Sequence, residues 1–161
     1  RRHSFPTRRS SDLDWKFFKN EFEKIYKKDI QLGKTKTTFI INNKWFPGAH
    51  IDNYIAQPLH LDFIALGKLE DIHTYEWLNT YRKKLKYGDD AYFITVSNNF
   101  SNPQEQYKMR FKKINKPVII RQFRSKKHVR NMLVYLLEIH IKSNIKNVTH
   151  LSLGRCILET Q

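Results

Sequence analysis

The 161-residue chain has one cysteine, two methionines and only five glycines. Because Cys156 has no second cysteine to pair with, an internal disulfide and a cysteine-based zinc site are both excluded, and the redox compartment stays undecided. No apolar run approaches the roughly 20 residues that a membrane-spanning helix needs. The longest run, residues 132–141, is interrupted by Glu138 and His140. We therefore expect the chain as given to form a soluble domain.

Acidic residues are also scarce, since 15 Asp and Glu stand against 30 Lys and Arg. The formal net charge is +15. Such a balance predicts attraction to an anionic partner, either nucleic acid or a phospholipid surface, without choosing between them. The hydrophobic content of 40% is enough for a chain of this length to bury the core of one domain.

The first thirteen residues, RRHSFPTRRSSDL, show no apolar periodicity and resemble the conceptual translation of a common DNA-sequencing adapter. We interpret residues 1–13 as a non-native artefact and exclude them from the fold prediction. An arginine-rich arm that grips nucleic acid is the alternative. Without this segment the net charge falls from +15 to +12, so the body is basic under either interpretation.

Residues 36–67 are the stretch around which the predicted fold is organised. A strand-forming run at residues 38–41 is followed by a helical pattern over 47–57. Pro47 suits the first helical position, and Pro58 ends the helix. A second apolar run at residues 61–67 completes a βαβ unit, whose two strands should be parallel.

An amphipathic helix is predicted before this unit, over residues 14–29. Its apolar side chains fall on one face: Trp15, Phe18, Phe22, Ile25 and Tyr26. Docking onto the sheet and lying on a membrane surface would both use such a face. We expect the sheet to cover it.

The rest of the chain continues the alternation of strands and helices. We predict helices at residues 72–86 and 103–114, strands at 91–96 and 117–124, and a closing strand or alternatively a helix at 129–142. The strand form would pair antiparallel with the strand before it. Residues 14–142 are thus expected to form a single α/β domain, a three-layer sandwich around a mostly parallel sheet of four to five strands with the last strand antiparallel. Residues 143–161 are left unassigned.

No constellation in the sequence predicts a catalytic residue, a metal site or a cofactor. His50 and Asp52, like Asp71 and His73, are spaced i, i+2, which puts their side chains on different faces of a helix. Lys34 stands in a Gly-Lys-Thr triplet that lacks the earlier glycine of a phosphate-binding loop and precedes a strand.

Polar residues with nearby aromatics follow two of the predicted strands. Lys44 and Trp45 come after the first strand, and Asn98 and Asn99 come after the third. In open parallel sheets, ligand crevices form beyond the carboxyl ends of the strands. Amides and aromatic rings suit sugars, although Asn and Ser also serve simply to make turns. These four residues are the predicted substrate-binding set.

Three segments carry a family resemblance: FIINNKWFPGAHIDNYIAQPL, GDDAYFITVSNNFSNPQEQY and FRSKKHVRNMLVYLLEIHIK. Together they resemble the soluble C-terminal region of bacterial multi-spanning membrane glycosyltransferases, the class that includes protein mannosyltransferases and lipid A aminoarabinose transferases. The resemblance covers roughly residues 14–142 through the order and spacing of elements, without a short invariant signature.

The resemblance implies a domain at the extracytoplasmic face of the cell membrane, packed on a membrane-embedded part. In that family the enzyme transfers a sugar from a polyprenyl-phosphate carrier, and its catalytic acid lies in the membrane part. No catalytic residue therefore carries over to this chain, and the implied partners are the membrane-embedded part and an anionic lipid or polyprenyl-phosphate sugar. Under this reading Lys44, Trp45, Asn98 and Asn99 would line the approach of donor or acceptor.

Two other functions stay open at the level of sequence. The Arg, Lys and aromatic mixture of residues 108–130 would suit a basic nucleic-acid-binding α/β domain, although no recognised motif accompanies it. A stand-alone enzyme acting on a small molecule is disfavoured because no acid–base set clusters in the sequence.

Overall fold

The structure, a computed structural model, describes residues 9–141 of the chain. It opens with helix α1, Arg9–Gln31, which begins inside the segment that we treat as non-native. Trp15, Phe18 and Phe22 are buried, and Ile25 and Tyr26 pack against the same core. The predicted amphipathic helix is confirmed, and the sheet rather than a membrane covers the apolar face of these five residues.

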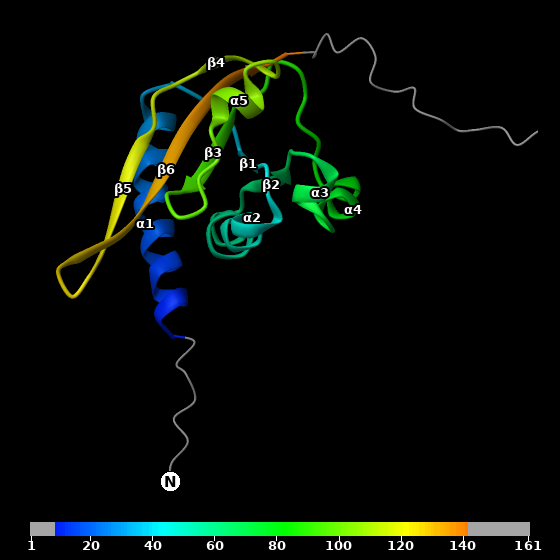
Figure 1. Cartoon of the computed structure of the whole chain (residues 1–161). Coiled ribbons are helices and arrows are strands. Elements are labelled where there is room, and N and C mark those ends of the chain that lie inside the picture. The colour runs from blue at the N-terminus through cyan, green and yellow to red at the C-terminus, as the bar shows by residue number, and fades with distance from the viewer. Residues whose placement is uncertain (1–8, 142–161) are drawn as a thin grey trace, which may run out of the picture.

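Three parallel strands form the centre of the sheet (Figure 1). They are β1, Phe39–Asn42, β2, Asp62–Ala65, and β3, Ala91–Val96. β1 lies between the other two and pairs with both in parallel, and every residue of β1 and β3 is buried. Continuous apolar runs are typical of parallel strands covered on both faces. The predicted βαβ unit and the predicted third strand are confirmed.

Between β1 and β2 the chain is helical but irregular. Helix α2, Trp45–Ile51, contains a non-helical Phe46, so regular helix begins at Pro47 as predicted. A wider helical turn, η1, Asp52–Ala56, and a single tight turn, η2, Gln57–Leu59, continue to the left-handed residue His60. The buried residues Ile51, Ile55 and Ala56 join the core that also holds α1.

Antiparallel strands complete the other side of the sheet. The last strand, β6, Lys127–His140, pairs antiparallel with β3 along one edge. Along its other edge it pairs with β5, Val118–Arg124, and then with β4, Phe111–Ile114. The strand order is β2-β1-β3-β6-β4 with β5 beside β6. The α/β class and the antiparallel last strand are confirmed, and the sheet has six strands instead of four to five.

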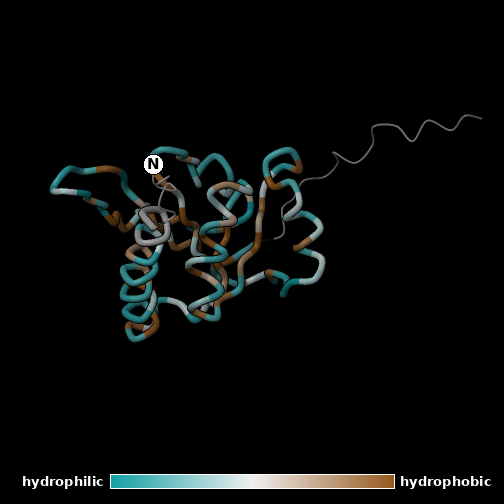
Figure 2. Tube along the Cα trace, turned by 90° about the horizontal axis from the view of Figure 1, so that it is seen from below, coloured by the Kyte–Doolittle hydropathy of each residue, from teal (hydrophilic) through white to brown (hydrophobic). Residues whose placement is uncertain are grey.

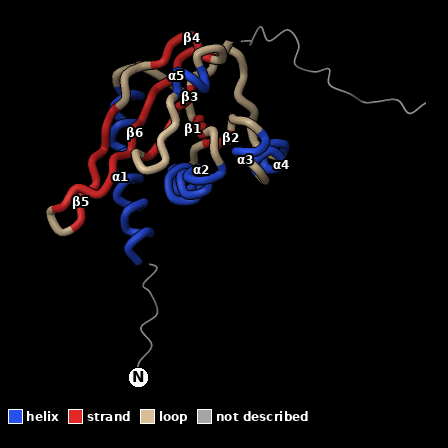
Figure 3. The backbone as a smooth tube through the Cα atoms, viewed as in Figure 1, coloured by secondary structure: helices blue, strands red, loops and turns tan. Residues whose placement is uncertain are grey.

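The two faces of the sheet are covered unequally. One face carries the larger core, with α1, α2 and η1 packed over it. The other face carries a smaller core around Phe93 and Leu137, to which the short helix α5, Pro103–Tyr107, and the half-buried Leu85 contribute. Figure 3 shows the strands as one layer with α1 running beside β5 and β6. No helix within residues 9–141 is long and apolar enough to cross a bilayer.

Two predicted helices are wrong in extent. Residues 72–86 were expected to be one helix, but the chain forms α3, Leu69–Ile72, and α4, Tyr75–Thr80. His73 separates them with a φ of 48°, a left-handed value that interrupts a helix. Beyond α4, the Arg82 guanidinium bonds to the Asp52 carboxylate and to the Phe63 carbonyl, so this part of the chain follows the edge of the sheet.

The second correction concerns residues 103–114. Helix α5 ends at Tyr107, and Phe111–Ile114 forms strand β4. The spacing of Tyr107, Phe111 and Ile114 imitates a helix, but β4 gains ladder hydrogen bonds by pairing with the free edge of β6. The unassigned residues 143–161, like residues 1–8, lie outside the described part of the chain.

Candidate functional site

The carboxyl ends of β2, β1 and β3 meet at one edge of the sheet, because the three strands are parallel neighbours. The loops that follow them approach one another there. They enclose an open depression of about 430 Å³. Its lining residues are Lys44, Trp45, Phe46, Glu70, Asp71, His73 and Asn99. We call this depression the crevice.

The loops after β1 and β3 are tied together by Asn99. The Lys44 ammonium donates to Asn99 Oδ1 at 2.9 Å, and Asn99 Nδ2 donates to the Phe46 carbonyl at 3.1 Å. Asn98, the remaining member of the predicted set, is exposed in the turn and does not line the crevice. The structure therefore brings together Lys44, Trp45 and Asn99 and leaves Asn98 outside.

Asn42, the last residue of β1, uses its side chain to shape the turn that leads into the crevice. Asn42 is 1% exposed, and its side chain accepts from the Lys44 amide at 2.8 Å while donating to the Ile94 carbonyl at 2.6 Å. Asn42 thus fixes the direction in which Lys44 leaves the sheet. The neighbouring Asn43 is buried, and its Oδ1 accepts no hydrogen bond from the described residues.

Aromatic rings form one wall of the crevice. Trp45 is 50% exposed and Phe46 41% exposed, which is unusual for rings beside a packed core. The Trp45 ring meets the His73 ring edge-on, with centroids 6.0 Å apart. Trp45 and His73 also line an adjoining depression of about 330 Å³ that reaches Tyr75. Burial, together with the adjacent Asp52 carboxylate, raises the pKa of Tyr75, so its hydroxyl stays protonated.

The predicted set did not include four of the crevice residues: Phe46, Glu70, Asp71 and His73. Phe46 directly follows Trp45. The other three follow β2 just as Lys44 follows β1, so the carboxyl-end rule applied to the second strand points to their segment. The i, i+2 spacing does not separate Asp71 from His73, because the helix ends at Ile72. Within residues 9–141 no group of three or more metal-ligating side chains lies close enough to hold an ion.

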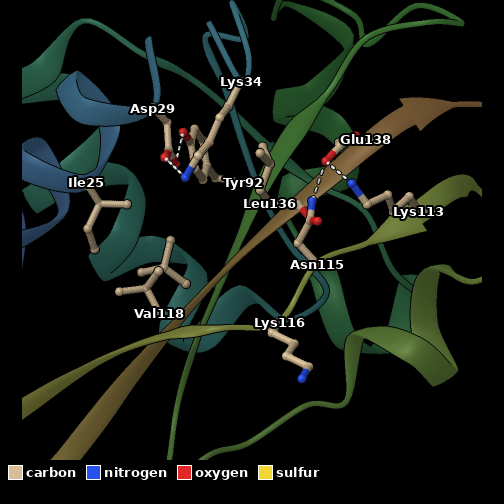
Figure 4. A pocket seen from close by; sticks show the side chains of 11 residues that line it. Ile25, Asp29, Lys34, Tyr92, Lys113, Asn115, Lys116, Val118, Leu136 and Glu138 are labelled. Atoms are coloured by element: carbon tan, nitrogen blue, oxygen red, sulfur yellow. Dashed lines mark hydrogen bonds and ion pairs between the residues drawn. The ribbon is translucent and has the colours of Figure 1, made fainter. Parts of the chain in front are cut away.

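A second pocket of about 360 Å³ lies between α1 and the β5–β6 pair (Figure 4). Its buried acid, Asp29, accepts from the Tyr92 hydroxyl at 3.0 Å and from the Lys34 ammonium at 3.0 Å. Across the pocket, Glu138 accepts from Lys113 at 2.9 Å and from Asn115 at 2.6 Å. These two bonds hold the pKa of Glu138 below its usual range. Each Asp29 oxygen accepts one of its two bonds, whereas both bonds to Glu138 reach the same oxygen, Oε1. The Lys34 ammonium is paired with Asp29.

The crevice is chemically suited to a polyhydroxylated ring. Exposed aromatic faces stack on the apolar faces of a sugar, while carboxylates and an amide bond its hydroxyl groups. The Lys44 ammonium uses one of its three N–H donors on Asn99 and keeps two for a neighbouring anionic group, and the His73 imidazole lies in the same lining. Comparison with protein-family models, with curated proteins and with solved structures found no match.

Proposed function

We propose that the chain is a non-catalytic, extracytoplasmic C-terminal domain of a membrane glycosyltransferase, and that its crevice binds the glycosyl part of a polyprenyl-phosphate sugar. The carrying observation is the crevice itself, where exposed Trp45 and Phe46 lie beside Lys44, Asn99 and two carboxylates. In this proposal the rings hold the sugar, the carboxylates and Asn99 select its hydroxyls, and Lys44 faces the carrier phosphate.

The binding claim is tested with a water-soluble, short-chain isoprenyl phosphate sugar followed by NMR or calorimetry. Replacing Trp45 by alanine removes the main stacking surface, so we expect about tenfold weaker binding. Lys44→Gln should weaken binding of the phosphate-bearing ligand more than binding of the free sugar. Trp77→Ala and Lys112→Gln are matched controls, because both residues are exposed and neither lines the crevice.

Two results would overturn this proposal. Undiminished binding by the Trp45→Ala variant would place the sugar elsewhere, and failure of every sugar in a panel to bind would remove the crevice as a carbohydrate site. The parent protein is tested separately by reading the genomic DNA upstream of the codon for Asp14. An open reading frame that encodes several hydrophobic spans supports the proposal, and an in-frame start codon beside Asp14 opposes it.

The second candidate function is nucleic-acid binding, favoured by the cations of residues 108–130. Arg121, Lys126 and Lys127 in this stretch form no ion pair with any described residue. A filter-binding titration with salt separates the two functions. Sub-micromolar affinity for DNA or RNA that falls steeply with salt would favour nucleic acid over the crevice proposal.

A further inference from the structure

The β5–β6 hairpin extends beyond the rest of the sheet (Figure 2). β3 pairs with residues 132–137 of β6, and Ser97 just beyond β3 still bonds to Asn131, so residues 127–130 have only β5 as a neighbouring strand. The two turn residues, Ser125 and Lys126, have positive φ values of 46° and 65°, as a tight two-residue hairpin turn requires. An isolated two-stranded ribbon is marginally stable, so something must hold it in place.

Helix α1 supports one side of this ribbon. The Arg124 guanidinium forms an ion pair with Asp14 near the start of α1. The Arg130 guanidinium lies over the rings of Trp15 and Phe18, 5.1 Å and 5.2 Å from their centroids. Ile120 and Gln122, in the middle of this side of β5, are buried at 7% and 3% exposure.

The opposite side of the ribbon is uncovered. Because side chains alternate along a strand, Ile119, Arg121 and Phe123 point away from the side that carries buried Ile120 and Gln122. Ile119 is 50% exposed and Phe123 is 57% exposed, and the Phe123 ring lies edge-on to the ring of His128 on the neighbouring strand, with centroids 5.6 Å apart. Val129 beside them is also exposed.

The charge of the hairpin has one sign. Residues 118–130 contain five Lys and Arg and no Asp or Glu. Arg124 and Arg130 are engaged by Asp14, whereas Arg121, Lys126 and Lys127 are exposed beside the bare apolar side chains. Apolar side chains flanked by cations match the interface of an anionic bilayer, where acyl chains begin just below the phosphate groups.

We propose that the outer side and the tip of the β5–β6 hairpin dock on an anionic phospholipid surface, with Ile119, Arg121, Phe123 and Val129 on the outer side and Lys126 and Lys127 at the tip. Phe123 and the two aliphatic side chains enter the headgroup region, and the three cations contact lipid phosphates. A nucleic acid would use the cations and the Phe123 ring but would leave Ile119 and Val129 in water, since aliphatic side chains offer no stacking surface. The surface is separate from the crevice and does not depend on its ligand.

The test is sedimentation of the full chain with vesicles of phosphatidylcholine containing phosphatidylglycerol, and with vesicles of phosphatidylcholine alone. We expect binding only to the anionic vesicles. The variant R121Q/K126Q/K127Q should bind about a hundredfold more weakly, since each cation near the surface contributes about 1 kcal/mol. The control K84Q/K86Q/K108Q loses the same charge from exposed lysines outside the hairpin and should bind nearly as well as the parent.

Insertion is measured with an environment-sensitive fluorophore on a single cysteine in a Cys156→Ser background. A label at Phe123→Cys should brighten and shift to the blue on anionic vesicles. A label at Tyr81→Cys, on a residue that is 74% exposed just beyond α4, should not change. Trp45→Ala should leave vesicle binding intact, which keeps this proposal distinguishable from that for the crevice.

Three results would overturn the docking proposal. If both triple variants bound anionic vesicles equally weakly, binding would depend on the net charge of the protein and not on the hairpin. If the label at residue 81 inserted and the label at residue 123 did not, the membrane-binding surface would lie near α4 and not on the hairpin. Oligonucleotide binding that R121Q/K126Q/K127Q abolishes, without vesicle binding, would assign the hairpin to nucleic acid.

Discussion

Replacing Asp52 by alanine should lower the free energy of unfolding by about 3 kcal/mol, because it leaves the Arg82 guanidinium without its carboxylate partner beside the core. Asp52 is 5% exposed and accepts from the Arg82 guanidinium at 2.7 Å and from the Tyr75 hydroxyl at 3.0 Å. The Arg82 guanidinium also lies over the rings of Phe63 and Tyr75. This network fastens the segment after β2 to the helical turn η1, so its loss loosens both. Urea denaturation followed by circular dichroism measures the effect.

Two further variants distinguish the effect of breaking the buried Asp52–Arg82 pair from the effect of removing any carboxylate. Asp71→Ala makes the same chemical change at a half-buried acid whose carboxylate accepts no hydrogen bond from the described residues, and should cost about 0.5 kcal/mol or less. Arg82→Met combined with Asp52→Ala should be less destabilising than the sum of the single changes, because no unpaired charge remains. Strict additivity in that cycle would show that the two side chains do not interact.

Gly67→Ala is expected to lower the free energy of unfolding by about 3 kcal/mol through a backbone clash. A Cβ at this position would lie 2.3 Å from the Asn43 carbonyl oxygen and 3.1 Å from the Asn43 Cα. Backbone atoms cannot turn away as a side chain does, so the ends of β1 and β2 must separate. The Leu66 amide donates to the Asn42 carbonyl at 2.7 Å at this point, and that bond would be strained. Thermal or urea denaturation measures the loss.

Gly67→Ala should also weaken ligand binding in the crevice, because Asn43 directly precedes Lys44. Gly48→Ala is the matched control. Its Cβ would approach the tip of the Phe63 ring at 3.2 Å and lie in ordinary contact with the Asn42 side chain at 3.8 Å, and alanine favours the helix in which Gly48 lies. We expect that variant to stay within about 1 kcal/mol of the parent. Equal stability of the two alanine variants would mean that the approach of Gly67 to β1 is not tight.

The sequence predicted elements whose local pattern and tertiary environment agree. The run Ala91–Val96 is apolar throughout and becomes β3 with the predicted bounds, because burial on both faces of a parallel strand requires such a run. The apolar face of α1, with Trp15, Phe18 and Phe22, was likewise predicted correctly to pack on the sheet. The residues after β1 and β3 were predicted as a binding set for the same reason, since parallel strands end at one edge.

The sequence-based prediction failed where the conformation of a segment depends on contact with a distant part of the chain. Phe111 and Ile114 are spaced like helix residues, and only the free edge of β6 makes Phe111–Ile114 a strand. The helix predicted for residues 72–86 ends at Thr80, and Arg82 just beyond it pairs with Asp52, which is 30 residues away in the chain. Phe46, Glu70, Asp71 and His73 join the crevice because three loops converge, and no single window of sequence contains that convergence.

The amino-acid order alone determined the α/β class, the parallel central strands, the covering helix and the strongly basic charge, since each depends on periodicity or composition. The tertiary structure decided which side chains share the crevice, and it decided that one side of the β5–β6 hairpin is locked to α1 while the other is bare. The physical reason is that a local pattern fixes which face of an element is apolar. Only the assembled sheet fixes which of those faces are already covered.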